Sequence, residues 1–361
     1  MTRVQLVTVA EDEAEQRVDR WLKRHWPHLG QARVEKMCRK GELRVDGGRV
    51  KASTRIRPGM VVRVPPFPDA GPEGEAAQRN GGPDSPVVAD ADAQILRDAV
   101  LMMDDDVIVL NKSPGLPVQG GSGQRRHLGM LLPALRFGRA DDPRLVHRLD
   151  KDTSGLLVLA RSGAAAASLS RAFRGRAVDK LYFAAVAGCP DPVAGSIRFG
   201  LVKKGSAGHE KMETVHPDAV RGIDGARTAL TEYKVLEQAG NRMAWVALRP
   251  VTGRTHQLRA HMAALGTPIA GDGKYGGRGQ ENLGDGWSAG LGGDLSRKLH
   301  LHACRLRFLH PRTGDPVVMT APLPAHMAQT WSMMGWRANV GDADLFDILN
   351  EPVRRDRRSS G

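Results

Sequence analysis

The chain has 361 residues, a hydrophobic fraction of 41% and a formal net charge of +13, with a pI near 10.1. This length allows two or three domains, and the lack of any run of about 18 apolar residues argues against a membrane span. Three cysteines without paired spacing, and an N-terminus that turns acidic too early for a secretory signal, indicate a cytoplasmic protein without disulfides or zinc. The positive charge favours a nucleic acid partner, because Lys and Arg side chains that neutralise phosphates release counterions.

Residues 12–65 are expected to form a small αβ unit. Apolar positions at helical spacing predict one helix in QRVDRWLKRHWP (16–27) and a second in GQARVEKMCRKGEL (30–43), which Gly41 should end. LRVDGGRV then predicts a hairpin with a Gly-Gly turn, and IRPGMVVRVP predicts a closing strand.

The second predicted helix is basic. Arg33, Lys36 and Lys40 follow one another at positions i, i+3 and i+7, and Glu35 is the one acid among them. A solvated helix face would explain this pattern, but the lack of compensating acids favours contact with phosphates. The two short helices and the following GELRVDGGRV and IRPGMVVRV resemble the S4 domain, a small RNA-binding module. The resemblance implies that the basic helix and the hairpin clamp structured RNA.

A break in composition separates this unit from a large domain. Residues 66–94 are rich in Pro, Gly, Ala and acids without periodicity, which predicts a flexible linker. Residues 95–335 then form the large domain, with an irregular Gly-rich loop at 276–298, and residues 336–361 form a tail. Its β-rich runs are VIVLNK, GLLVLAR, LYFAAVAG, TEYKVLE and AWVALRP, with a helical stretch in GAAAASLSRAFRGR. This alternation predicts an α+β fold with a mixed, mainly antiparallel sheet.

The stretch HRLDKDTSG (147–155) concentrates charge in a connection between two apolar runs. Asp150 and Asp152 are two residues apart, so both point to one face of an extended segment and could serve a hydrolase as an acid pair. Asp152 precedes Thr-Ser-Gly, where a short acid usually accepts backbone N–H bonds in a turn. We therefore expect Asp152 to be structural, with a hydrolase kept as an alternative.

Several histidines raise the question of a metal site. His256 and His261 are five positions apart, so they do not share one helix face as an i, i+4 ligand pair would. His300, His302 and His310 follow, but no cysteine or carboxylate completes a ligand set. Packing or hydrogen-bonded histidines are expected, and no metal.

The segment RPVTGRTHQLRAHMAALGTPIAGDGKYGG (249–277) predicts a helix that Thr255 caps and Gly266 ends. Arg254, His256 and Arg259 would then lie at the start of that helix, where the helix dipole opposes positive charge. A local anion is therefore expected beside them, either a carboxylate or a bound phosphate.

These segments together closely resemble the RluA family of pseudouridine synthases. His147 to Gly155 match the pattern His-Arg-Leu-Asp-x-x-Thr-Ser-Gly, and Gly253 to His261 match Gly-Arg-x-His-Gln-Leu-Arg-x-His. Lys180 and Tyr182 match the Lys-x-Tyr element. The resemblance spans about residues 95–325, and the S4-like head makes it most similar to the RluC branch, which acts on large-subunit 23S ribosomal RNA.

The resemblance implies a role for each matched residue. Asp150 corresponds to the catalytic aspartate, whose role as nucleophile at C1′ or as base on the sugar stays open, and Arg259 to the arginine that pairs with it. Tyr182 corresponds to the tyrosine that packs on the target uracil, and Arg148 to the arginine that enters the stack where the nucleotide flips out. The residues expected to contact RNA are Arg148, His147, Arg254, His256, Lys112 and Lys180, with Arg33, Lys36 and Lys40 in the small unit.

The expected reaction isomerises uridine to pseudouridine without metal or cofactor. The expected partner is 23S rRNA or a precursor of the large ribosomal subunit, and the protein is expected to be a monomer. A non-catalytic RNA-binding assembly factor is the second alternative. Asp150, Tyr182 and Arg259 together weigh against it, because a factor without catalysis has no need of this set.

Overall fold

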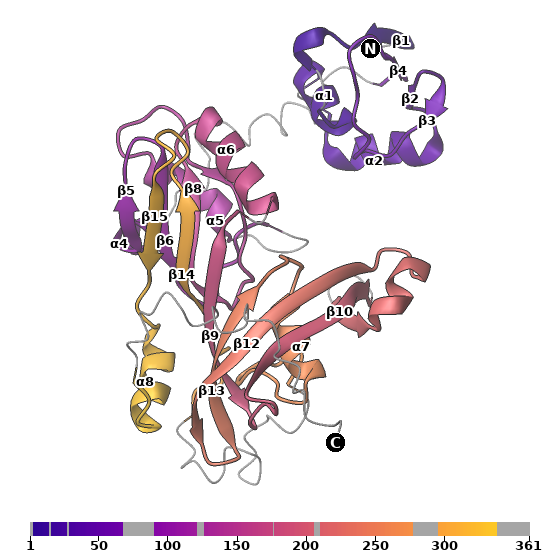
Figure 1. Ribbon diagram of the computed structural model, residues 1–361. Helices are drawn as coiled ribbons and strands as arrows, with labels where there is room; N and C mark the ends of the chain where they lie inside the picture. Colours follow the sequence, from indigo (N-terminus) through magenta and orange to yellow (C-terminus); the bar gives the residue numbers. More distant parts are fainter. Residues whose placement is uncertain are drawn as a thin grey trace, which may run out of the picture. The chain divides into compact units, whose positions relative to one another are not determined.

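The computed structural model describes residues 3–337, apart from 14–15, 27–28, 68–89, 121–125, 176, 206–209 and 277–294. The chain divides into two compact units, Met1–Val87 and Val88–Gly361 (Figure 1). Most of the predicted linker, most of the Gly-rich loop and the predicted tail beyond residue 337 lie outside the described residues.

The small unit is an αβ unit, as predicted. Its helices are α1 (Val18–His25) and α2 (Gln31–Lys40), and its antiparallel sheet has the order β1 (Gln5–Thr8), β4 (Val61–Val64), β2 (Arg44–Val45), β3 (Gly48–Arg49), with a short 3-10 helix η1 (Glu11–Glu13). Gly41 ends α2 with a φ of +69°. The hairpin turn is Asp46-Gly47, not the predicted Gly-Gly, and both residues have the positive φ that a type I′ turn needs.

The small unit extends beyond the predicted boundaries of 12 and 65. Strand β1 pairs along its whole length with β4, so the fold begins near residue 5. At the other end Phe67, 3% exposed, packs in the same core as Trp21 of α1 and Met37 of α2. Sequence patterns missed both ends because a four-residue strand and a single aromatic residue are too short to show periodicity.

The large unit is built on an eleven-stranded mixed sheet with the order β11-β10-β12-β13-β9-β14-β8-β6-β5, to which β15 adds beside β14 and β7 beside β8. The strands are β5 (Val100–Met103), β6 (Val107–Lys112), β7 (Arg144–Leu145), β8 (Ser154–Ala160), β9 (Asp179–Ala187), β10 (Ala194–Lys204), β11 (Lys211–Val215), β12 (Arg227–Ala239), β13 (Met243–Pro250), β14 (Leu301–Leu309) and β15 (Pro316–Thr320). Among the described strands, only β8 and β14 pair in parallel. The predicted α+β fold with a mainly antiparallel sheet is confirmed.

The helices of the large unit are α4 (Asp90–Asp98), α5 (Leu128–Leu131), η3 (Leu132–Leu135), α6 (Gly163–Arg174), η4 (Pro217–Gly222), α7 (Gln257–Ala264) and α8 (Ala325–Met333). Helix α4 begins inside the segment predicted as linker, which therefore ends earlier than residue 94. No helix in the described part of the chain is long and apolar enough to cross a membrane.

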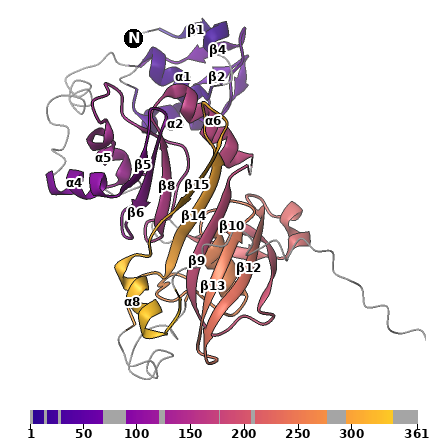
Figure 2. The same ribbon diagram turned by 60° about the vertical axis from the view of Figure 1, so that its left-hand side comes forward.

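Alternate residues of β8 pack on different helices. Val158 joins Leu169 of α6 in one apolar cluster, whereas Leu157 joins Leu96 of α4 and Leu128 of α5 in another (Figure 2). This alternation is the period-two pattern of a strand covered on both faces. The β8 segment is thereby held rigidly, and the loop that carries Asp150 leads directly into it.

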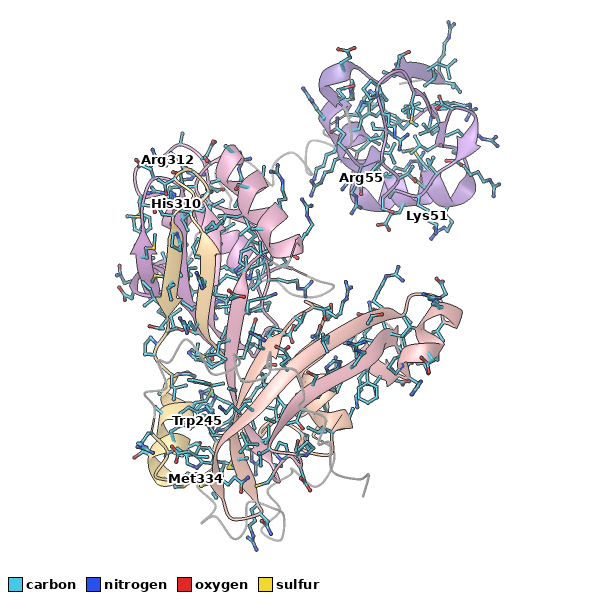
Figure 3. All side chains as sticks on the ribbon, viewed as in Figure 1. Lys51, Arg55, Trp245, His310, Arg312 and Met334 are labelled. Atoms are coloured by element: carbon cyan, nitrogen blue, oxygen red, sulfur yellow. The ribbon has the colours of Figure 1, made fainter. Side chains whose placement is uncertain are left out.

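A third cluster joins helix α8 to strand β13, near the middle of the strand order. Trp245 of β13 lies beside α8, and its ring meets that of Trp331 edge to face with 5.5 Å between centroids (Figure 3). Trp336 contacts the same two rings. Such aromatic contacts add to the burial energy of the rings and attach α8 to the back of β13.

Candidate active site

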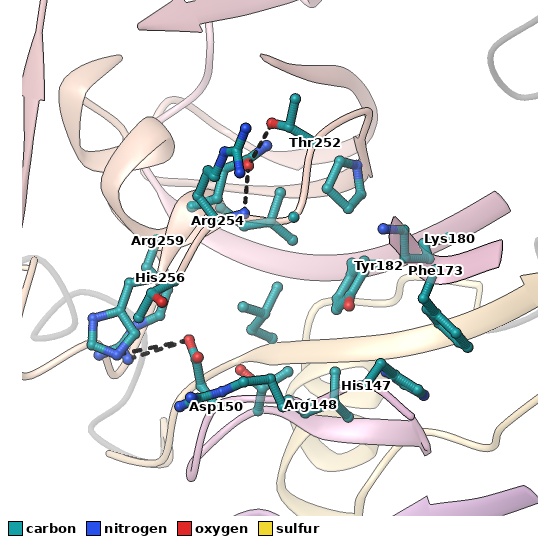
Figure 4. A pocket seen from close by; sticks show the side chains of 18 of the residues that line it. His147, Arg148, Asp150, Phe173, Lys180, Tyr182, Thr252, Arg254, His256 and Arg259 are labelled. Atoms are coloured by element: carbon teal, nitrogen blue, oxygen red, sulfur yellow. Dashed lines mark hydrogen bonds and ion pairs between the residues drawn. The ribbon is translucent and has the colours of Figure 1, made fainter. Parts of the chain in front are cut away.

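Asp150 lies in the loop between β7 and β8, on a wall that two cavities share. The first cavity has a volume of about 310 Å³ and the second of about 680 Å³. The residues that line both are Arg148, Leu149, Asp150, His256 and Arg259. The Asp150 side chain is 18% exposed, so its carboxylate is open to a molecule in the cavities (Figure 4).

Lys112, at the end of β6, anchors the Asp150 loop from inside the protein. Its Nζ donates hydrogen bonds to the carbonyl oxygens of Ser113 at 2.8 Å, Leu116 at 3.0 Å and Lys151 at 3.0 Å. Burial lowers the pKa of Lys112 to about 8. The predicted phosphate contact is not found, because all three donors of the ammonium are used inside the protein and Lys112 lines neither cavity.

The start of β8 fixes the other end of the loop. Gly155 has a φ of +107°, and a Cβ there would lie 2.3 Å from the carbonyl oxygen of Ala303 in β14. Ser154 Oγ lies 2.9 Å from His302 Nδ1. By contrast, Asp152 is exposed and makes no hydrogen bond or ion pair with any residue that the structure describes. The expected turn role of Asp152 is therefore not found, and glycine sterics and Ser154 shape this connection instead.

Arg259 is held mainly by a carboxylate that sequence reasoning missed. Asp272 accepts hydrogen bonds from Arg259 Nε at 2.7 Å and Nη2 at 2.8 Å, and the Asp272 side chain is fully buried. The remaining Nη1 lies 3.7 Å from Asp150 Oδ2. The expected anion beside the helix start is thus a carboxylate, but Asp272 is the close partner and Asp150 the more distant one.

Helix α7 begins one residue later than predicted. His256, not Thr255, stands at the N-cap, with a φ of +50° that non-glycine residues seldom adopt. Gly266, with a φ of +85°, follows the end of the helix as predicted. The strained backbone at His256 points to a fixed and unusual placement of its ring.

Gln257 binds the start of α7 to strand β12. Its Oε1 accepts hydrogen bonds from Thr252 Oγ1 at 2.7 Å and from the Arg254 N–H at 3.0 Å. Its Nε2 donates to the Leu230 carbonyl and to Thr231 Oγ1, both at 2.9 Å. Gln257 is 3% exposed, so every polar atom of a buried amide is paired.

Tyr275 connects His256 to strand β11. Its hydroxyl accepts the N–H of Met212 at 3.0 Å and lies 3.0 Å from His256 Nδ1. The other ring nitrogen, His256 Nε2, lies 4.0 Å from Asp150 Oδ2. Asp272 and Tyr275 both come from GDGKYGG (271–277), where polar side chains alternate with glycines and no periodic pattern marks them as site residues.

Tyr182 and Lys180 line the first cavity from β9, as Figure 4 shows. Burial raises the pKa of Tyr182 and lowers that of Lys180. His147 lines this cavity too, but its Nε2 accepts the Val158 N–H at 2.9 Å and its ring stacks on Phe173 with 4.0 Å between centroids. Burial lowers the pKa of His147 to about 3, so its ring is neutral and holds the loop in shape.

The remaining predicted RNA contacts are exposed side chains. Arg148 and Arg254 lie on the cavity walls, and Arg254 Nε also donates to the Thr228 carbonyl at 3.1 Å. In the small unit Arg33, Lys36 and Lys40 are exposed on α2, where Lys40 pairs with Glu42 at 3.8 Å.

The small sheet adds a basic row that was not predicted. Arg63 of β4 lies opposite Arg44 of β2, and Arg44 lies opposite Arg49 of β3, so the three share one face. No carboxylate among the described residues pairs with any of them. Like charges directly across a sheet repel one another, which makes this face a favourable place for an external anion.

The other buried histidines differ in their contacts: neither ring nitrogen of His261 has a hydrogen-bond partner among the described residues. His300 and His302 are buried and both ring nitrogens of each have hydrogen-bond partners. Asp104, Asp106 and His310 bring three potential ligand atoms within 4.8 Å of one another. His310 Nε2 already contacts Asp104 Oδ2 at 3.2 Å, and the group lines neither cavity.

Comparison with known proteins identifies the family. A family model described as RNA pseudouridylate synthase matches residues 106–264. A ribosomal large subunit pseudouridine synthase C from Vibrio cholerae is 35% identical over 335 residues, which cover 92% of this chain and 98% of the relative. The Yersinia pestis protein of the same name is 36% identical over 324 residues, 89% of this chain and 92% of its own.

A solved structure supports the same assignment. Human RNA pseudouridylate synthase domain containing 4 is 31% identical, with a TM-score of 0.56, over 67% of this chain and 95% of its own. These matches confirm the resemblance read from the motifs and displace the hydrolase alternative. Because relatives align along nearly its whole length, the chain belongs to the RNA pseudouridylate synthase family, whose members are isomerases.

Proposed function

We propose that this protein converts specific uridines of 23S ribosomal RNA to pseudouridine, in free rRNA or in a precursor of the large ribosomal subunit. The observation that carries the proposal is the placement of Asp150, whose carboxylate opens to two cavities and faces a fixed guanidinium 3.7 Å away. The names of the relatives support the choice of substrate, since they are ribosomal large subunit pseudouridine synthases.

The proposed reaction exchanges one glycosidic bond for another. The N1–C1′ bond of uridine breaks, the base turns, and C5 bonds to C1′ while the C5 proton is lost and N1 gains one. The atoms balance without a co-substrate. Asp150 supplies the carboxylate, as nucleophile at C1′ or as base on the sugar, and Arg259 attracts that charge once RNA has displaced water from the cavity.

The first cavity suits the flipped uracil. Tyr182 offers a ring for stacking, and Pro250, Leu258 and Leu301 add apolar walls. Burial raises the pKa of Tyr182, so its phenol keeps its proton and can donate a hydrogen bond to the base. Enzymes that flip bases hold them by this combination of stacking and hydrogen bonds.

The second cavity suits the sugar and its phosphates. It shares Asp150 with the first cavity, and Lys151, Lys274 and Lys298 line it. Arg148 lies on the wall between the two cavities, where a planar cation can stack in place of the flipped nucleotide.

We assign RNA binding to the small unit as well, through the exposed basic face of α2 and the row formed by Arg63, Arg44 and Arg49. Both surfaces carry positive charge of the kind that neutralises phosphates. The protein is proposed to act as a monomer in the cytoplasm, without a cofactor, since the chemistry above needs none.

The proposal is tested by incubating the protein with unmodified 23S and 16S rRNA transcripts and mapping pseudouridine by carbodiimide treatment and reverse-transcription stops. Stops at a few uridines of 23S rRNA are expected, with none in 16S rRNA. If no stops appear in either transcript or in precursor particles, the protein is not a large-subunit pseudouridine synthase.

A further inference from the structure

Two donors from neighbouring elements face the same oxygen of Asp150. Arg259 Nη1 lies 3.7 Å from Oδ2 and His256 Nε2 lies 4.0 Å from it (Figure 4). In each of these two contacts the shortest distance ends on Oδ2. We propose that His256 and Tyr275 are positioning residues: Tyr275 fixes the tautomer of His256, and His256 with Arg259 holds Oδ2 so that Oδ1 is presented to the ribose.

The single proton of the Tyr275 hydroxyl determines the tautomer of His256. The oxygen accepts the Met212 N–H, and a phenol has a single proton to donate. The described acceptor for that proton is His256 Nδ1, 3.0 Å away. A neutral imidazole that accepts at Nδ1 carries its proton on Nε2, the nitrogen that faces Asp150.

Burial, more than the neighbouring charges, keeps the pKa of His256 below its ordinary value. Burial lowers the pKa of His256 most, Arg259 and Lys274 lower it further, and Asp150 and Asp272 raise it, with a net decrease. Burial raises the pKa of Tyr275, so the phenol keeps its proton at neutral pH.

Tyr275 is itself held firmly. It is 8% exposed, and its backbone N–H donates to Asp272 Oδ1 at 3.1 Å. The Arg259 guanidinium and Lys211 Nζ lie 5.2 Å and 4.9 Å from the centroid of its ring. Asp272 therefore supports both donors, Arg259 directly and His256 through Tyr275. Both N–H groups that face Oδ2 are thus held in place by contacts inside the protein, and hydrogen bonds to an ionised carboxylate are among the strong ones.

The present distances are too long for hydrogen bonds, which need about 3 Å. Catalytic hydrogen bonds are often long without substrate and tighten when substrate binds. A shift of the Asp150 loop by about 1 Å would bring Oδ2 within reach of both donors together.

This inference rests on the proposed role of Asp150, and its test has a readout independent of activity. In full-length protein labelled with ¹⁵N-histidine, His256 should show a protonated Nε2 and an unprotonated Nδ1 near neutral pH. Tyr275→Phe should remove this fixed pattern. Tyr233→Phe is the matched control, because the Tyr233 hydroxyl also bonds inside the protein, to the Pro192 carbonyl at 2.9 Å, but lines neither cavity.

Single-turnover kinetics then test the consequence. Tyr275→Phe should slow conversion of bound RNA about tenfold with RNA affinity unchanged, whereas Tyr233→Phe should not. His256→Gln, whose amide can donate from the place of Nε2, should retain more of the rate than His256→Ala. If Tyr275→Phe does not fold, the comparison of His256→Gln with His256→Ala tests the proposal in its place.

Three results would overturn the proposal: a wild-type His256 with Nε2 unprotonated, a Tyr275→Phe rate equal to that of Tyr233→Phe, or equal rates for His256→Ala and wild type. If wild-type protein forms no pseudouridine at all, the proposed function fails. The labelled histidine still reports whether Tyr275 fixes the tautomer.

Discussion

Asp272 holds Arg259 with two hydrogen bonds of 2.7 and 2.8 Å, and the guanidinium so fixed directs its free Nη1 toward Asp150. The Asp272 carboxylate thus fixes the Arg259 guanidinium in an orientation that faces the Asp150 carboxylate. This arrangement resolves the unfavourable charge at the start of α7, where cations oppose the helix dipole.

Replacing Asp272 should lower the stability of the protein. Asp272→Asn removes the charge of a fully buried ion pair, so we expect the free energy of unfolding to fall by about 3 kcal/mol. Urea denaturation measures this. Glu232→Gln is the control, since it breaks the partly exposed pair with Arg249 and should cost about 1 kcal/mol or less. If Asp272→Asn and Glu232→Gln lost the same unfolding free energy, the buried pair of Asp272 with Arg259 would contribute no more to stability than the partly exposed pair.

Gly155 should tolerate no side chain. Gly155→Ala places a Cβ 2.3 Å from the Ala303 carbonyl oxygen at a φ of +107°, so a loss of at least about 3 kcal/mol in unfolding free energy is expected. A Cβ added at Gly222 would have no atom within 4 Å, so Gly222→Ala should leave the unfolding free energy nearly unchanged. Thermal denaturation of both variants measures the difference. A Gly155→Ala protein as stable as the control would mean that β8 and β14 are not in close contact.

His147 should make the protein acid-sensitive. Its pKa is lowered to about 3 in the folded state, so the unfolded chain binds the extra proton first and stability falls as pH drops below about 6.5. His147→Gln can accept the same Val158 N–H but does not titrate. Between pH 7 and 4 the wild type should lose roughly 3 kcal/mol more than this variant. If the wild type and His147→Gln lost the same unfolding free energy between pH 7 and 4, the folded protein would not hold the His147 ring neutral.

The basic face of α2 should set part of the salt dependence of RNA binding. Replacing Arg33, Lys36 and Lys40 with Ala should weaken binding of 23S rRNA segments. It should also reduce the slope of log affinity against log salt by roughly 2, if each contact releases about 0.7 counterions. Lys51 is also exposed in the small unit but lies outside α2 (Figure 3), so Lys51→Ala is the control for the loss of positive charge elsewhere on this unit. An unchanged slope would remove α2 from the RNA interface.

The sequence predicted well those elements that carry a local signal. The β-rich runs that became β6, β8, β9, β12 and β13 are dense in apolar residues, and α6 has both an N-cap serine and a helical apolar stripe. Strand β10 was missed because its glycines and lysines hide the period-two pattern, and β14 because its histidines and arginines do.

The chemistry of the site was predicted less evenly, for a similar reason. The three residues taken from the motif matches, Asp150, Tyr182 and Arg259, all line the first cavity. The support of Arg259 by Asp272, and the interior role of Lys112, depend on contacts between segments far apart in the chain. No pattern along the sequence reports whether an ammonium group faces solvent or three carbonyl oxygens.

The most direct test of the account compares Asp150→Asn with Asp152→Asn, two isosteric changes on one loop. Pseudouridine formation in 23S rRNA is measured by carbodiimide mapping under single-turnover conditions. We predict that Asp150→Asn loses activity by about a thousandfold or more, while the exposed Asp152→Asn stays within a few-fold of wild type. An active Asp150→Asn protein would contradict the claim that Asp150 supplies the reacting carboxylate.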